Sequence, residues 1–200
     1  MLKIAFNQSY IYPLEENHRF PMIKYELIPE QLIRENTCVN DNFFNPGKID
    51  KKLVLLTHQE EYFDRFKSLK LSKKEIREIG FPLSKELVER EMEIAQGTVM
   101  GVNYSLKNGI SMNIAGGTHH AFFDRGEAFC MLNDQSIAAN YLLKEKLVKK
   151  IMIIDLDVHQ GNGTASIFKR NNNVFTLSFH GKKNYPFRKE ISDLDIEFED

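Results

Sequence analysis

Residues 151–164, IMIIDLDVHQGNGT, decide the fold class of this 200-residue chain. Four apolar residues open the stretch, and a short apolar run bounded by polar residues and glycines is typical of a strand buried on both faces of a parallel sheet. Asp155, Asp157 and His159 follow at alternate positions, so their side chains point the same way if the backbone stays extended. Two carboxylates and an imidazole at the carboxyl end of a strand suit a divalent metal ion such as zinc. The alternative is a strand that ends in a polar loop, with the acids as helix caps. This interpretation would be preferred for a single acid, but two acids and a histidine on one face favour a metal or catalytic site.

The segments around this strand alternate between apolar runs and helical patterns. Further strands are predicted over residues 2–6, 53–56, 110–115 and 174–178. Helices are predicted from Pro21, over residues 59–69, from a capping box at Ser72, and over residues 85–106, 133–146 and 165–170. Residues 7–20 and 35–50 are expected to be irregular, and the chain after Gly181 is expected to be a polar, acidic tail. This alternation indicates one α/β domain over residues 1–200, with three layers and a mostly parallel central sheet.

The composition limits which partners and which cellular compartment are expected. The chain has 27 basic and 28 acidic residues and a net charge of -1, so no overall field steers it to nucleic acid or to acidic lipid. Two cysteines are too few for a disulfide framework, which favours a reducing compartment. No apolar stretch is long enough for a signal peptide or a membrane span. We therefore expect a cytoplasmic protein with no nucleic-acid or membrane partner.

A second group of polar residues follows the predicted strand at 110–115. Residues 115–121 read AGGTHHA, in which the paired glycines allow a sharp turn or a close approach to a ligand. His119 and His120 come at the carboxyl end of their strand, the same end as the acids after residue 151. Imidazoles suit general acid–base chemistry near neutral pH. Asp155 and Asn162 are candidates to hold the second ring nitrogen of each histidine and so to fix its tautomer.

Residues 126–134, GEAFCMLND, lead into the predicted helix at 133–146. Residue chemistry leaves two interpretations of Phe129 open, a core side chain or a wall of a substrate site. Asn133 or Asp134 is expected to cap the helix.

Together these motifs resemble the zinc-dependent histone deacetylase family, and its bacterial class IV branch best. The matching stretches are residues 18–25 (HRFPMIKY), 116–120 (GGTHH), 124–126 (DRG), 128–130 (AFC) and 155–163 (DLDVHQGNG). The resemblance spans nearly the whole chain. It implies an arginase/deacetylase fold and the hydrolysis of an acyl-lysine in a protein or of a small acylated amine.

The resemblance also implies roles for single residues. Asp157 and His159 would be ligands of one zinc ion, and His119 and His120 would face the metal-bound water, each held by the partner named above. The zinc ion would polarise the acyl carbonyl and the water, and His120 would take the water proton and later protonate the leaving amine. Arginase-like relatives use two manganese ions and need an acid where this chain has Gly161, so one metal ion is favoured.

Other positions carry over in the same way. Phe129 would form one wall of the acyl-lysine tunnel, and Gly117 would line the substrate site. Arg19 would lie beside an internal channel through which the acid product leaves. Asp155 and Ser178 match positions that help to hold a structural potassium ion.

The chain departs from the family pattern in its last third. The family has a third zinc ligand, an aspartate, and an oxyanion-stabilising tyrosine in a glycine-rich turn. After His159 the aspartates are Asp193, Asp195 and Asp200, all in the expected tail, and Tyr185 lies in a basic loop. We therefore expect the N-terminal two-thirds of a deacetylase domain, which lacks C-terminal strands that would lie between the strands at 110–115 and 151–155. Alone, such a chain is predicted to be a poor deacetylase. The alternative is a non-catalytic remnant, or a subunit completed by another polypeptide.

Overall fold

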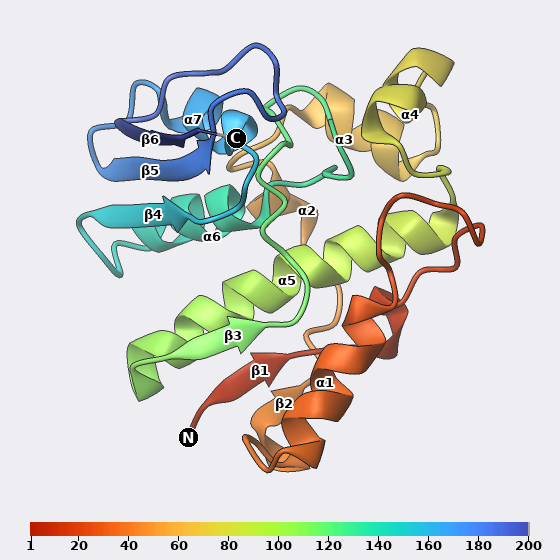
Figure 1. Ribbon diagram of the computed structural model, residues 1–200. Helices are drawn as coiled ribbons and strands as arrows, with labels where there is room; N and C mark the ends of the chain where they lie inside the picture. Colours follow the sequence, from red (N-terminus) through yellow and green to blue (C-terminus); the bar gives the residue numbers. More distant parts are fainter. Residues whose placement is uncertain (200) are drawn as a thin grey trace.

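Two three-stranded parallel sheets form the framework of the chain (Figure 1). A computed structural model describes residues 1–199. The first sheet has the order β2-β1-β3 and consists of β1 (Lys3–Ala5), β2 (Phe43–Phe44) and β3 (Ser111–Asn113). The second has the order β4-β5-β6 and consists of β4 (Ile151–Asp155), β5 (Val174–Gly181) and β6 (Leu194–Phe198). All four pairings are parallel, which confirms the predicted α/β class.

The two sheets share no strand pairing within residues 1–199, because β3 pairs only with β1 and β4 pairs only with β5. This division corresponds to the break expected between the strands at 110–115 and 151–155. One feature of β4 was predicted wrongly. Ile153 is buried against the helices, but Met152 and Ile154 on the other face are 59% and 52% exposed. The second face stays open because the helices cover only the side on which Ile153 packs with Ala139 and Phe168.

The helices pack against these strands in the order of the chain. They are α1 (Lys24–Arg34), α2 (Lys51–Val54), α3 (Glu60–Lys67), α4 (Lys73–Ile79), α5 (Lys85–Asn108), α6 (Asp134–Lys144) and α7 (Asn162–Phe168), with 3-10 turns at Gln8–Tyr10 and Asn40–Asn42. The long helix α5 contacts β1, β3 and α6, so it joins the first sheet to the second half of the chain (Figure 1). No helix in the described part of the chain is both long and apolar enough to span a membrane.

The ends of the helices follow the capping rules. Ser72 and Glu75 form the predicted capping box of α4, and Ser84 accepts the N–H of Leu87 at the start of α5. Gly109 ends α5 with φ +85°, a conformation that glycine adopts without strain. Along α5 the buried residues include Leu87, Met92, Ala95 and Val99, as predicted, whereas Val102 is half-buried and Leu106 is 50% exposed.

Three segments differ from the prediction. Residues 35–50 are not wholly irregular, because Phe43–Phe44 forms β2 by pairing with β1, a long-range contact that leaves no local pattern. Residues 53–56 are not a strand, since they lie in α2 and the turn after it, where the Asp50 carboxylate accepts the N–H of Lys52 at 2.8 Å and so starts a helix. The acidic segment after Gly181 is not wholly a tail, because it forms β6. This strand was missed because its stability comes from pairing with β5 and from side-chain contacts, such as that of Asp193 with Thr176, and not from an apolar pattern.

Candidate active site

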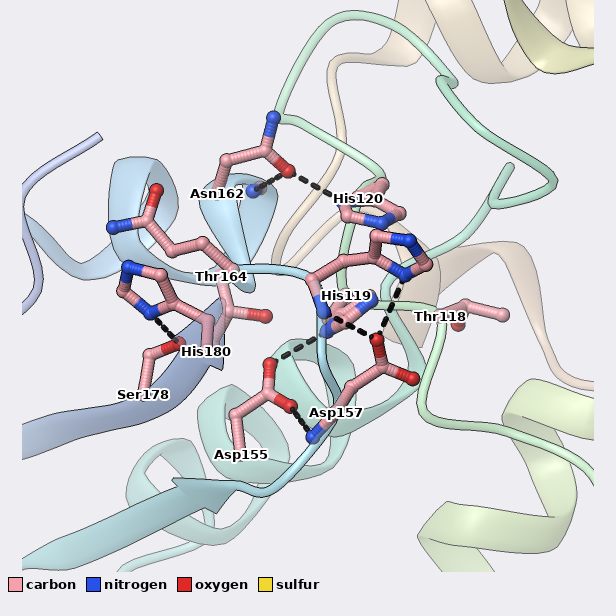
Figure 2. Close-up of polar contacts among 12 residues, drawn as sticks. Thr118, His119, His120, Asp155, Asp157, Asn162, Thr164, Ser178 and His180 are labelled. Atoms are coloured by element: carbon pink, nitrogen blue, oxygen red, sulfur yellow. Dashed lines mark hydrogen bonds and ion pairs between the residues drawn. The ribbon is translucent and has the colours of Figure 1, made fainter. Parts of the chain in front are cut away.

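The loops that follow β3 and β4 line one cavity of about 660 Å³. His119 and His120 come from the loop after β3, and Asp157 and His159 from the bend after β4. These segments meet although β3 and β4 belong to different sheets, because Asp155 at the end of β4 holds His119 and Asn162 at the start of α7 holds His120. Figure 2 shows the side chains of His119, His120 and Asp157 together with Asp155 and Asn162.

His119 is fixed by Asp155. Its Nδ1 lies 2.5 Å from Oδ2 of Asp155, and the other carboxylate oxygen accepts the N–H of Asp157 at 3.0 Å (Figure 2). A carboxylate only accepts, so the proton sits on Nδ1 and leaves Nε2 free. The turn at Gly161 permits this approach, because a Cβ there would stand 2.2 Å from the carboxylate oxygen.

His120 is fixed by Asn162. The amide oxygen of Asn162 accepts from Nδ1 of His120 at 2.7 Å and also from the N–H of Gly163 at 3.0 Å. The second bond identifies the amide atom as oxygen, so Nδ1 of His120 donates and Nε2 carries the lone pair. Burial, together with the neighbouring His119, lowers the pKa of His120 to about 3. The ring is therefore neutral near pH 7, with its lone pair on Nε2.

Asp157 and His159 form a pair of metal-ligand type. Nδ1 of His159 lies 2.9 Å from Oδ1 of Asp157, and the side chains are 40% and 50% exposed, respectively. Burial alone would raise the pKa of Asp157, but the N–H of His159 and the nearby imidazoles hold it below its ordinary value. The ring of His159 lies 6.0 Å from that of His120. The predicted stripe of three is thus divided, because the backbone bends after Asp155 and only Asp157 and His159 remain side by side.

No third ligand joins this pair within residues 1–199, where no group of three histidine, cysteine or acidic residues is placed to hold a metal ion. Asp193 accepts hydrogen bonds from the backbone N–H and the hydroxyl of Thr176, at 2.8 and 3.0 Å. Asp195 accepts from the Gln160 amide at 2.9 Å. Asp200 lies outside the described residues. The two described aspartates are therefore occupied in holding β6.

Phe129 lies both at the cavity and against the hydrophobic core. It lines the cavity, yet its ring also packs on Phe20 and Phe81 with centroid separations of 5.3 and 5.1 Å. Its φ is +66°, and its N–H bonds the carbonyl of Ile79 at 2.6 Å. Arg19, which is exposed, lies over this ring with its Cζ 5.7 Å from the centroid.

The remaining predicted positions are also close by. Gly117 lines the cavity with φ +67°, a conformation that favours glycine. Ser178 is buried and lies opposite Asp155 in the register of β4 and β5. Its hydroxyl is 3.0 Å from Nδ1 of His180.

Tyr185 is a cavity residue that sequence reasoning missed. Its ring stands edge-on to that of His120 at 5.0 Å and lies 6.0 Å from that of His159. The phenol donates a hydrogen bond to Glu127, and burial, followed by the effect of Glu127, raises the pKa of Tyr185. No motif surrounds Tyr185 in the sequence, and only the return of the loop after β5 brings it to the histidines.

Two residues at the start of α6 bind the backbone on either side of the two histidines. Asp134 accepts the N–H of Thr118 at 2.9 Å, just before the pair. Asn133 donates to the carbonyl of Ala121 at 3.1 Å, just after the pair, and to the hydroxyl of Thr164 at 3.0 Å. Asn133 is also the predicted helix cap, since its side chain accepts the N–H of Ser136 at 3.0 Å.

Comparison with known proteins identifies the class to which this fold and site belong. The model of the histone deacetylase domain matches residues 14–197. The chain therefore belongs to the histone deacetylase family. Solved structures with the same arginase/deacetylase fold include a deacetylase homologue from Aquifex aeolicus, with a TM-score of 0.81 and 23% identity over 99% of this chain and 59% of that one. This likeness confirms the predicted fold.

The chain is also similar in sequence to several proteins over most of its length. An uncharacterised protein of Picosynechococcus is 38% identical over 96% of this chain and 64% of its own length. Histone deacetylase 2 of Arabidopsis thaliana is 26% identical over 93% of this chain and 50% of its own length. The acetoin utilization protein AcuC of Staphylococcus aureus is 28% identical over 88% of this chain and 48% of its own length. The chain thus spans about half to two thirds of the length of the curated relatives it matches.

Proposed function

We propose that this chain supplies the acid–base residues and two metal ligands of a zinc-dependent deacylase of the class IV type. Its substrate is an acyl-lysine of a protein or a small acylated amine. The observation that carries the proposal is the orientation of His120. Asn162 holds its Nδ1 at 2.7 Å, which leaves Nε2 as a proton acceptor in a ring 6.0 Å from that of His159.

The donor atoms of the residues present suit zinc, but the described residues supply two ligands and not three. A carboxylate and an imidazole are zinc donors, and catalytic zinc sites take three donors from protein. Asp157 and His159 would hold the ion, and a further carboxylate would come from outside the described residues. When bound, zinc polarises a carbonyl and lowers the pKa of water. Gly161 offers no acid for a second metal ion, and Asp155 with Ser178 would help to hold potassium.

The other cavity residues act on the proton and on water. His120 accepts the proton of the attacking water at Nε2 and returns it to the leaving amine. Asp155 keeps His119 in the matching tautomer. Phe129, Gly117 and Arg19 line the route of the acyl group and its acid product. Buried reduced cysteines, Cys38 and Cys130, support a cytoplasmic location, and the net charge of -1 gives no reason to expect a nucleic-acid partner.

A non-catalytic remnant, or a subunit completed by a second polypeptide, is the alternative. It is favoured by the two-donor metal pair and by the open edges of β3 and β4. Strand edges with unpaired backbone groups accept another segment readily.

The test uses an acetyl-lysine peptide and zinc, with the chain alone and with the part of the Picosynechococcus relative that the chain does not cover. We expect activity near background alone and deacylation in the mixture. The same mixture with His120→Ala should be inactive. Deacylation by the chain alone would overturn the need for a further ligand. An inactive mixture in which the two polypeptides bind each other would support the remnant.

A further inference from the structure

Three cations that line the cavity, Lys24, Arg19 and the exposed Arg77, form no ion pair with a carboxylate of residues 1–199. Lys24 is half-buried, and its Nζ lies 4.7 Å from the ring centre of Phe20 and 5.1 Å from that of Tyr25. Arg19 lies in the same way over Phe129. Neither forms an ion pair with any carboxylate of residues 1–199. Their aromatic contacts hold the charges at the cavity wall without neutralising them.

The acidic side chains that line the cavity have other partners or roles. The described carboxylates that line it are those of Asp157 and Glu78. Asp157 belongs to the proposed metal pair, and Glu78 lies on α4, 3.7 Å from Lys74. A fourth cation of the wall, Arg90, is buried and paired with its neighbour Glu91. The cavity therefore keeps excess positive charge beside the candidate active site.

The deacylation proposed above releases one carboxylate, that of the acid product, and Arg19 in the cavity wall is a cation that could bind it. Lys24 is a second cation without a role in that reaction. Burial lowers the pKa of Lys24, while the charge of Asp157 opposes this effect. A charge that has lost water gains more from an anionic partner than a surface charge does.

We propose that the acyl group taken by this cavity ends in a carboxylate, as in succinyl- or glutaryl-lysine, and that Lys24 binds this carboxylate. The inference rests on the proposed function and names its substrate class. The cavity, of about 660 Å³, lies within the size range of ligand pockets and is far larger than an acetyl group needs.

The experiment compares two peptides that differ only in charge. One carries glutaryl-lysine and the other its terminal carboxamide, and binding is measured by calorimetry with a chelator present, so that no metal ion holds the carboxylate. We expect the intact chain to bind the glutaryl peptide about tenfold more tightly, the gain typical of one partly buried ion pair. Lys24→Met should abolish the preference. Lys144→Met, at the exposed end of α6, is the matched control and should keep it.

The outcomes separate this inference from the proposed function. Equal affinity for the two peptides would overturn the role of Lys24 and leave the acyl-lysine function standing. If Lys24→Met binds neither peptide, Lys24 has a structural role only, and the inference that it binds the acyl carboxylate would also be overturned. Failure of both peptides to bind the unaltered chain would contradict the proposed function, and this inference with it.

Discussion

The amide oxygen of Asn162 accepts hydrogen bonds from His120 and from the backbone N–H of Gly163, at 2.7 and 3.0 Å. This double contact fixes the amide orientation and, through it, the tautomer of His120. An uncharged partner orients the ring without stabilising its protonated form as a carboxylate would. The base thus stays neutral in a buried site.

Asn162→Asp should raise the pKa of His120, because the new carboxylate favours the imidazolium. The pKa is about 3 in the unaltered chain. We expect an increase of about 1 to 3 pH units. Histidine NMR titration of the metal-free protein measures this change. Asn172→Asp, an exposed position after α7, should leave the pKa unaltered. An unchanged pKa in Asn162→Asp would mean that the ring does not face residue 162.

Gly161→Ala should destabilise the chain by about 1–3 kcal/mol, because its Cβ would stand 2.2 Å from the Asp155 carboxylate. The displaced carboxylate would also release His119. Chemical denaturation measures the free energy of unfolding. Gly101→Ala in α5 is the control, since its Cβ would meet only the Ser111 side chain, with the hydroxyl at 3.2 Å, and alanine favours a helix. Equal effects of the two substitutions would contradict the packing argument.

Asp157→Asn and His159→Ala should each weaken zinc binding by at least about tenfold, the lower limit for losing even a hydrogen-bond partner of a ligand. Competition with a fluorescent chelator measures the affinity. Asp124→Asn, an exposed acid on a neighbouring loop, should have no effect. Zinc affinity that is indifferent to both ligand substitutions would place the metal elsewhere.

His58 should make the fold sensitive to acid. Burial lowers its pKa from 6.5 to about 4. Between these values the unfolded chain binds a proton that the native chain does not, so the free energy of unfolding falls as the pH drops from 6.5 toward 4. The full loss is about 3 kcal/mol. Urea denaturation across this interval measures it.

His58→Gln should flatten part of this slope, since glutamine can still accept the N–H of Asn133 that His58 accepts at 2.9 Å. His120 keeps the rest of the slope, because its pKa is lowered too. An unchanged slope in the variant would exclude His58 as the cause.

Asn133→Ala should cost about 2–4 kcal/mol, the sum of one helix cap and two buried hydrogen bonds. Ser84→Ala in α5 removes a cap with fewer other contacts and should cost about 1 kcal/mol. Thermal or chemical denaturation compares them. If Asn133→Ala costs no more than Ser84→Ala, the contacts of Asn133 with Ala121 and Thr164 add nothing to stability.

The sequence alone predicted the elements whose signals are local. The strand that begins with the apolar run at residues 151–154, the capping box at Ser72 and the long amphipathic helix all appear where their patterns indicated. Short-range hydrogen bonds and burial on one face leave a trace in neighbouring residues. The Gly-Gly-Thr-His-His stretch and the DLDVH stretch likewise indicated a polar site at the ends of two strands.

Tertiary structure decided the rest. Residues 194–198 form a strand only because β5 offers a partner, and residues 53–56 form a helical turn because Asp50 caps it. Tyr185 reaches His120 only through the fold of its loop. Residue spacing alone allowed Asp155, Asp157 and His159 to point the same way. The bend after Asp155 separates them, and Asp155 holds His119, the contact that the family resemblance implied. Such contacts join residues that are distant in the chain, and their energy depends on positions that no local pattern records.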